Sequence, residues 1–249
     1  MGRVRGWLFS LGRFAFFCWD FLKAAVRQPP PPGATMLEAY RIGIRSMPIL
    51  LIIAAFVGTN LSLQGYYAFK PLGGQRLVGM FVALAGVREL APIIAASMIA
   101  AKAGTEMASQ IAVMRIRDQI DALEVMAVNP HWYLITPRLL GIVLVMPALT
   151  TIAMYVMVAA AYIVGVYQLG LNGAEFLEFA VQAADTRDLF FGGLKAMIFG
   201  VIICMVSCYN GFYSGHGARG VGTATNTAVV TAAVTCVVLN YFISELVYG

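Results

Sequence analysis

Five long apolar stretches constrain this chain more than any other feature of its sequence. They cover about residues 48–69, 77–101, 139–167, 189–213 and 221–247. A bilayer core about 30 Å thick takes roughly 20 helical residues, so each stretch is long enough to cross it. Long apolar runs without alternation favour helices over the strands of a barrel. We therefore predict an all-α, polytopic membrane protein with five transmembrane helices.

The composition supports a membrane protein. The 249 residues are 60% hydrophobic and 12% charged, whereas soluble domains are about 25% charged. Charged residues interrupt the first 30 positions, which argues against a cleaved signal peptide. Twelve lysines and arginines flank the predicted spans on one side and three on the other. Such an excess marks the cytoplasmic side, so we expect a cytoplasmic N-terminus and an external C-terminus. The excess of basic side chains then faces anionic lipid head groups, which explains it better than binding to nucleic acid.

The N-terminal region, residues 1–47, is predicted to hold amphipathic helices ahead of a five-helix transmembrane domain at 48–249. Apolar residues from Trp7 to Val26 recur every three or four positions, as in a helix that lies in the membrane interface. A soluble helix that binds a partner is the alternative. Thr35 and Glu38 form a capping-box pattern that predicts a second short helix, running into the first span near Pro48.

Charged and polar residues within the predicted spans are the first candidates for a functional site. Arg88 and Glu89 lie inside the second span, where each ionised group costs about 2.5–3.5 kcal/mol unless it is compensated. Neighbouring helical residues point in different directions, so each should reach another helix, and Lys195 is a candidate partner for Glu89. A structural ion pair and a role in substrate handling or gating both remain open. The outer half of the first span is polar, and two explanations of it also remain open: packing between helices, or a cavity that opens toward the outer leaflet.

The segment at about 114–128, between the second and third spans, predicts a short cytoplasmic amphipathic helix. Ile116, Ile120, Leu123 and Met126 make one apolar stripe, and charged residues fill the rest of its surface. Membrane-surface helices usually carry lysine and arginine on their polar face, whereas this face also carries acids. We therefore favour docking into a cytoplasmic protein over a helix resting on the membrane.

The sequence contains no motif that indicates a catalytic or ATP-binding site. A phosphate-binding loop for ATP is absent, and the cysteines and histidines lack metal-ligand spacing. We expect no catalytic residue, metal or cofactor in this chain, so energy must come from a partner. A secondary transporter that uses Arg88, Glu89 and Lys195 is the alternative. An intramembrane enzyme is the third class, but the spans show no paired nucleophile and base.

Several ordered motifs resemble the permease family typified by MlaE and YrbE, over about residues 35–245. These motifs are Arg88-Glu89-Leu90-Ala91-Pro92, Gly104-Thr105-Glu106-Met107-Ala108, Gln119-Ile120-Asp121-Ala122-Leu123-Glu124-Val125-Met126, Cys208-Tyr209-Asn210-Gly211-Phe212 and Gly217-Ala218-Arg219-Gly220-Val221-Gly222. The family often has an aspartate where this chain has Asn240, and an arginine where it has Lys102.

The resemblance implies a homodimeric permease of an ABC transporter in the bacterial inner membrane. Such a permease moves phospholipids or related lipids between the inner and outer membranes. Two cytoplasmic ATPase subunits, which bind ATP and Mg, would drive it, and a ring of MCE-domain proteins would cover its external face, including residues 168–188. The resemblance further implies a coupling helix with its ATPase contacts at Arg115, Arg117, Asp118, Gln119, Asp121, Ala122, Leu123 and Glu124. It also implies a lipid pocket at the dimer interface with Thr59, Asn60, Leu61, Leu63, Gln64 and Leu90.

Overall fold

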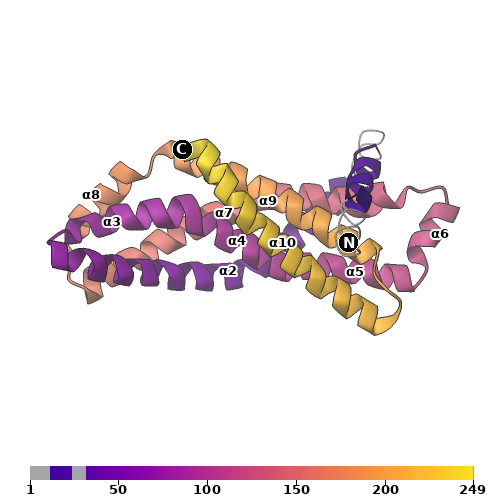
Figure 1. Ribbon diagram of the computed structural model, residues 1–249, viewed down its shortest axis with the longest axis horizontal. Helices are drawn as coiled ribbons and strands as arrows, with labels where there is room; N and C mark the ends of the chain where they lie inside the picture. The colour runs from indigo at the N-terminus through magenta and orange to yellow at the C-terminus, as the bar shows by residue number, and fades with distance from the viewer. Residues whose placement is uncertain (1–11, 24–31, 249) are drawn as a thin grey trace, which may run out of the picture.

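The computed structural model describes residues 12–23 and 32–248. In this part of the chain, five helices are long and apolar enough to cross a membrane: Gly33–Leu72, Gln75–Ile116, Pro130–Gln168, Arg187–Phe212 and Gly217–Val247. They run back and forth along the long axis of an elongated bundle (Figure 1). The prediction of an all-α protein with five membrane-spanning helices is confirmed.

The second and third passes of the bundle are each built from successive helical segments. The first pass is α2 (Pro32–Phe69), which the short turns η1 (Lys70–Leu72) and η2 (Gln75–Leu77) join to the second. The second pass comprises α3 (Val78–Phe81), η3 (Val82–Leu90), α4 (Ala91–Ile99), η4 (Ala100–Gly104) and α5 (Thr105–Ile116). The short α6 (Gln119–Val125) leads to α7 (Pro130–Ile163) with η5 (Val164–Gln168), then α8 (Gly173–Ala183), α9 (Thr186–Phe212) and α10 (Gly217–Tyr248).

The first pass differs from its prediction, because α2 is one helix that continues through Pro48. The expected short helix starting near Thr35 is instead the first part of α2. Proline removes one backbone hydrogen bond, a loss that membrane helices tolerate when neighbouring helices support them. Here α7 packs along α2, so the helix has that support on both sides of Pro48.

Polar side chains define where the later helices begin. The Asn129 side chain accepts hydrogen bonds from the backbone N–H groups of His131 and Trp132, at 3.0 and 3.4 Å, and Pro130 occupies the first turn. Asp185 and Asp188 form a capping box at the start of α9. Each cap satisfies N–H groups that a helix leaves open at its N-terminus. α8 lies at the opposite end of the bundle from α6 (Figure 1).

The bundle core forms where α7 packs between α2 and α9, and where α10 packs on α9 and α5. Small residues allow close approach of helices in membranes. Gly58 of α2 is such a residue, because a Cβ at this position would overlap the backbone carbonyl of Met157 in α7. Large apolar side chains such as Ile52, Phe56 and Leu144 point outward, as expected of helices surrounded by lipid.

A short helix at residues 12–23 lies against the bundle near the end that carries α6 (Figure 1). Its Phe17 is buried and makes edge contacts with the rings of His131, Tyr209 and Phe212, at centroid distances of 5.2–5.8 Å. Phe16 and Trp19 are exposed. This arrangement suits an interfacial helix with one face on the protein and one on lipid. The parts of the predicted helix before residue 12 and after residue 23 lie outside the described residues.

The contact at Gly58 generates a test of the packing of α2 on α7. We expect Gly58→Ala to lower the free energy of unfolding by about 1–3 kcal/mol, because the added methyl group overpacks a backbone contact. Thermal and denaturant unfolding of the purified protein in detergent measure this change. Gly222→Ala in α10 is the matched control, because a Cβ there meets no atom within 4 Å. Equal stability of the two variants would contradict the close approach of α2 and α7.

Candidate functional site

The two adjacent charges of the second pass lie in η3, a π-helical segment that ends just before Pro92. Proline has no N–H, so it cannot make the usual α-helical bond to the carbonyl four residues earlier, which belongs to Arg88. Lys195 of α9 donates to that carbonyl oxygen at 3.1 Å. A cation from another helix therefore contacts the backbone where the sequence interrupts α-helical bonding.

The carboxylate of Glu89 joins three passes of the bundle. Lys195 Nζ lies 3.4 Å from its Oε1 atom. Its Oε2 atom accepts hydrogen bonds from Asn240 Nδ2 at 2.7 Å and from Ser244 Oγ at 2.9 Å. Lys195 is only 1% exposed and also donates to Ser244 Oγ at 2.7 Å. The ammonium and the carboxylate thus each have several polar partners, which is the condition under which buried charges are tolerated.

Arg88 points to a different partner from Glu89. Its Nε lies 3.0 Å from Asp188 Oδ1, and its Nη2 donates to the Ala183 carbonyl at 3.2 Å. Asp188 is buried, and it also accepts from the backbone N–H of Asp185 in the capping box of α9. Arg88 consequently ties the second pass to the end of α8 and the first turn of α9. Each of the two adjacent charges thus reaches another helix.

Asn240 occupies the position where the resembling family often has an acid. An aspartate there would put a second carboxylate within 2.7 Å of Glu89, and two carboxylates so close cannot both ionise without a large cost. The asparagine amide instead donates to Glu89 and leaves two cations and two anions in the cluster of Arg88, Glu89, Asp188 and Lys195. A cavity of about 510 Å³ opens beside Glu89, Asn240 and Ser244.

The predicted lipid-pocket residues of α2 divide between its surface and its interior. Asn60 and Gln64 are exposed, Thr59 and Leu63 are half-buried, and Leu61 is buried in the chain's own core. Leu90, in η3, packs partly against the same core cluster as Leu61. The Asn60 amide donates to the Phe56 carbonyl of its own helix at 3.1 Å. Within one chain, Asn60 and Gln64 form an exposed polar surface on α2.

The predicted cytoplasmic helix is shorter than expected, because α5 continues to Ile116 and α6 covers only Gln119–Val125. Arg117 leaves helical geometry and Asp118 adopts a left-handed conformation with φ 55°, which separates the two helices. Figure 1 places α6 at the tip of the bundle. Ile120 is fully buried and anchors α6 to the rest of the chain. Part of the predicted apolar stripe is therefore covered by this chain itself.

Two features of α6 bear on its use as a docking surface. Arg115, at the end of α5, binds the Asp121 carboxylate at 2.6 Å, so this acid holds α6 in place. Gln119, Ala122 and Glu124 are exposed, and Leu123 is half-buried. The apolar side chains of Val125 and Met126 are 88% and 63% exposed. They form an apolar tip beside the acidic face of α6.

Sequence reasoning missed a polar network at the same end of the bundle. Glu106 of α5 binds Arg45 of α2 at 3.2 Å and accepts from Gln110 at 3.2 Å. Gln110 in turn accepts from Arg138 of α7 at 3.1 Å. The four residues are spread over three sequence segments, so no local pattern could have paired them. Asp188 was also missed as the partner of Arg88, although the spacing of Asp185 and Asp188 matches a capping box.

The Glu89–Lys195 contact predicts strong coupling between two substitutions. Glu89→Gln and Lys195→Met alone should each destabilise the protein. The first leaves the buried Lys195 ammonium without its carboxylate partner, and the second leaves the half-buried Glu89 carboxylate without its cation. The double variant should lose less unfolding free energy than the two single variants added together, with a coupling energy of about 1–3 kcal/mol. Unfolding of the four proteins in detergent measures the cycle. Additive losses would mean that the two side chains do not interact.

Known proteins share sequence similarity with this chain over most of its length. A sequence model described as "Permease MlaE" matches residues 35–246. A probable ABC transporter permease protein from Rickettsia conorii is 36% identical over 239 residues, which is 96% of this chain and 92% of that protein. One from Synechocystis is 34% identical over 214 residues, covering 86% of this chain and 81% of that protein.

A third similar protein comes from a plant. Protein TRIGALACTOSYLDIACYLGLYCEROL 1, chloroplastic, from Arabidopsis thaliana is 31% identical over 214 residues, which is 86% of this chain and 61% of that protein. The family model covers most of the chain, and the permease relatives match it over nearly their full length. The chain belongs to the MlaE permease family.

Proposed function

We propose that this protein is the membrane subunit of an ABC transporter that moves phospholipids or related lipids between the inner and outer membranes of a bacterium. Two copies of the chain would form the permease, separate ATPase subunits would bind ATP and Mg, and MCE-domain proteins would receive or deliver lipid on the external face. The family and the probable ABC transporter permeases among its relatives support the transporter class. The galactolipid named in the plant relative supports a lipid substrate.

The exposed surface of α6 is the observation that carries this proposal. A chain without a nucleotide-binding loop needs a surface through which a partner's motion can reach its helices. α6 offers an acidic face with an apolar tip, at the end of the bundle where the positive-inside rule places the cytoplasm. Ile120 and the Arg115–Asp121 ion pair fix α6 to the end of α5, so a push on α6 would displace the second pass as a unit.

The outer half of α2 is the proposed lipid-contacting surface of the dimer. Asn60 and Gln64 are exposed there, although polar side chains that face hydrocarbon are costly. A second copy of the chain, water in a cavity or a lipid head group would each provide polar partners. Movement of the second pass would change the distance between the two copies, and with it the width of the pocket, so that lipid is released toward the external side.

A secondary transporter remains the alternative function. It would use Arg88, Glu89 and Lys195 as a relay for protons or ions. Each of these groups already contacts oppositely charged or polar partners inside the protein, which favours a structural tether over a relay.

The apolar tip of α6 gives a direct test of ATPase docking. We expect Val125→Asp with Met126→Asp to reduce co-purification of the ATPase subunits at least tenfold, because two charges would replace apolar contacts that become desolvated on binding. Leu72→Asp is the matched control, because Leu72 is as exposed but lies at the far end of the bundle. Unchanged ATPase recovery from the double variant would overturn α6 as the coupling surface.

A further inference from the structure

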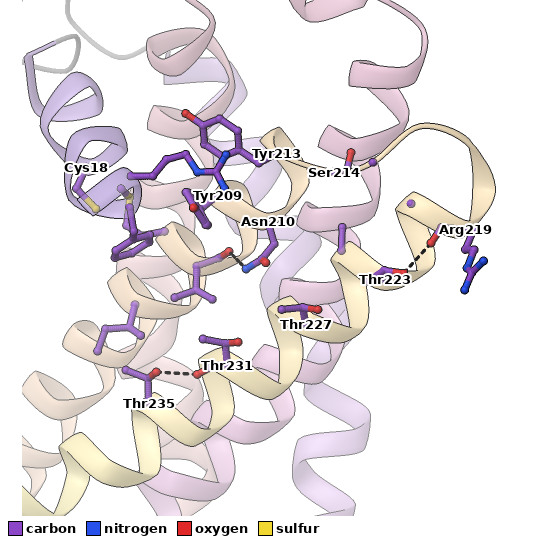
Figure 2. Close-up of a pocket in the computed structure, with 18 of the residues that line it drawn as sticks. Cys18, Tyr209, Asn210, Tyr213, Ser214, Arg219, Thr223, Thr227, Thr231 and Thr235 are labelled. Atoms are coloured by element: carbon purple, nitrogen blue, oxygen red, sulfur yellow. Dashed lines mark hydrogen bonds between the residues drawn. The ribbon is translucent and has the colours of Figure 1, made fainter. Parts of the chain in front are cut away.

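A groove of about 1,260 Å³ lies between the helix at 12–23, α9 and α10. In Figure 2, Tyr209 of α9, Tyr213 directly after α9 and Cys18 of the short helix border one side of it. Thr223, Thr227, Thr231 and Thr235 follow one another along α10 on the other side. The groove is separate from the outer half of α2, where the transported lipid is proposed to bind.

The inner walls of the groove are chemically suited to an acyl chain. Val201, Ile202, Met205 and Val206 supply apolar side chains from α9. Thr223 and Thr235 donate their hydroxyls to carbonyls of their own helix, at 2.9 and 2.7 Å. These internal bonds satisfy the hydroxyl groups without a ligand. Thr223 and Thr235 are thereby compatible with a hydrocarbon ligand.

The length of the groove matches one leaflet of a bilayer. Twelve residues separate Thr223 from Thr235, which corresponds to roughly 18 Å along a helix. Half of the hydrocarbon core is about 15 Å thick. An acyl chain that enters at the α6 end could therefore follow α10 to about the middle of the membrane.

Two arginines line the groove at the end where α10 begins. Arg13 lies over the ring of Tyr213 at 5.0 Å from its centroid, and Arg219 is exposed in the first turn of α10. Both arginines are among the described residues that line the groove, and this lining includes no aspartate or glutamate. Arginine binds phosphate through charge and through its planar array of donors. The charge at this end is thus complementary to an anionic head group.

We propose that the groove binds one anionic glycerophospholipid from the leaflet on the α6 side, with its head group at the end lined by Arg13 and Arg219 and an acyl chain along the threonine row. The bound lipid fills the space between the helix at 12–23 and α10. It thereby attaches the N-terminal helix to the part of the bundle that leads to α6. This site selects the surrounding lipid by charge and is separate from the transport pathway, so it does not depend on the proposed transport function.

Photocrosslinking from the groove tests this proposal. The full-length protein carries p-benzoylphenylalanine at Thr227 and is placed in nanodiscs of equal phosphatidylglycerol and phosphatidylcholine. Val230 is the matched control position, because it lies less than one turn away on α10 and faces outward. We expect mass spectrometry to find phosphatidylglycerol adducts at Thr227 more than tenfold above phosphatidylcholine adducts, and near-equal adducts at Val230.

Charge substitutions then test the head-group end. Arg13→Gln and Arg219→Gln should each lower the phosphatidylglycerol preference at Thr227 about fivefold, the contribution of one basic residue near an anionic surface. Arg117→Gln, an exposed arginine at the same end of the molecule, should leave it unchanged. Equal adducts of the two lipids at Thr227 would overturn the proposal. Adducts to residues 1–11 or to a second copy of the chain would also overturn it, because either would show a protein occupant.

Discussion

The ammonium group of Lys195 is the point on which the packing of this bundle depends. It is almost completely buried and contacts the Arg88 carbonyl, the Glu89 carboxylate and the Ser244 hydroxyl. These groups belong to the second and fifth passes, whereas Lys195 belongs to the fourth. Apolar contacts between membrane helices gain little from the hydrophobic effect, because lipid is equally apolar. A shared charged cluster therefore provides orientation that side-chain packing alone would leave weaker.

The two ends of the bundle are specialised in different ways. At the α8 end, the Arg88–Asp188 pair connects the middle of the second pass to the start of α9. At the α6 end, the network of Arg45, Glu106, Gln110 and Arg138 joins α2, α5 and α7. A displacement of α6 would thus reach three passes at once. Coupling through such packed and hydrogen-bonded units requires two discrete arrangements of the bundle, which the proposed transport cycle would supply.

The sequence predicted the large features because they depend on local composition. Long apolar runs specify the five spans. The continuity of α2 through Pro48 was not predictable, because it depends on support from α7, which is far away in the sequence. The same applies to the site. Charge cost indicated that Arg88 and Glu89 need partners, but only the fold shows that Asp188, Asn240 and Ser244 supply them.

We propose that ATP hydrolysis by a partner moves lipid through this permease. Transfer of fluorescent phospholipid from proteoliposomes that contain the purified complex of permease, ATPase and external ring measures this most directly. We predict transfer that requires hydrolysable ATP, fails with a non-hydrolysable analogue and persists when a protonophore removes the proton gradient. Transfer that proceeds without ATP and stops with the protonophore would contradict the account and would favour a secondary transporter.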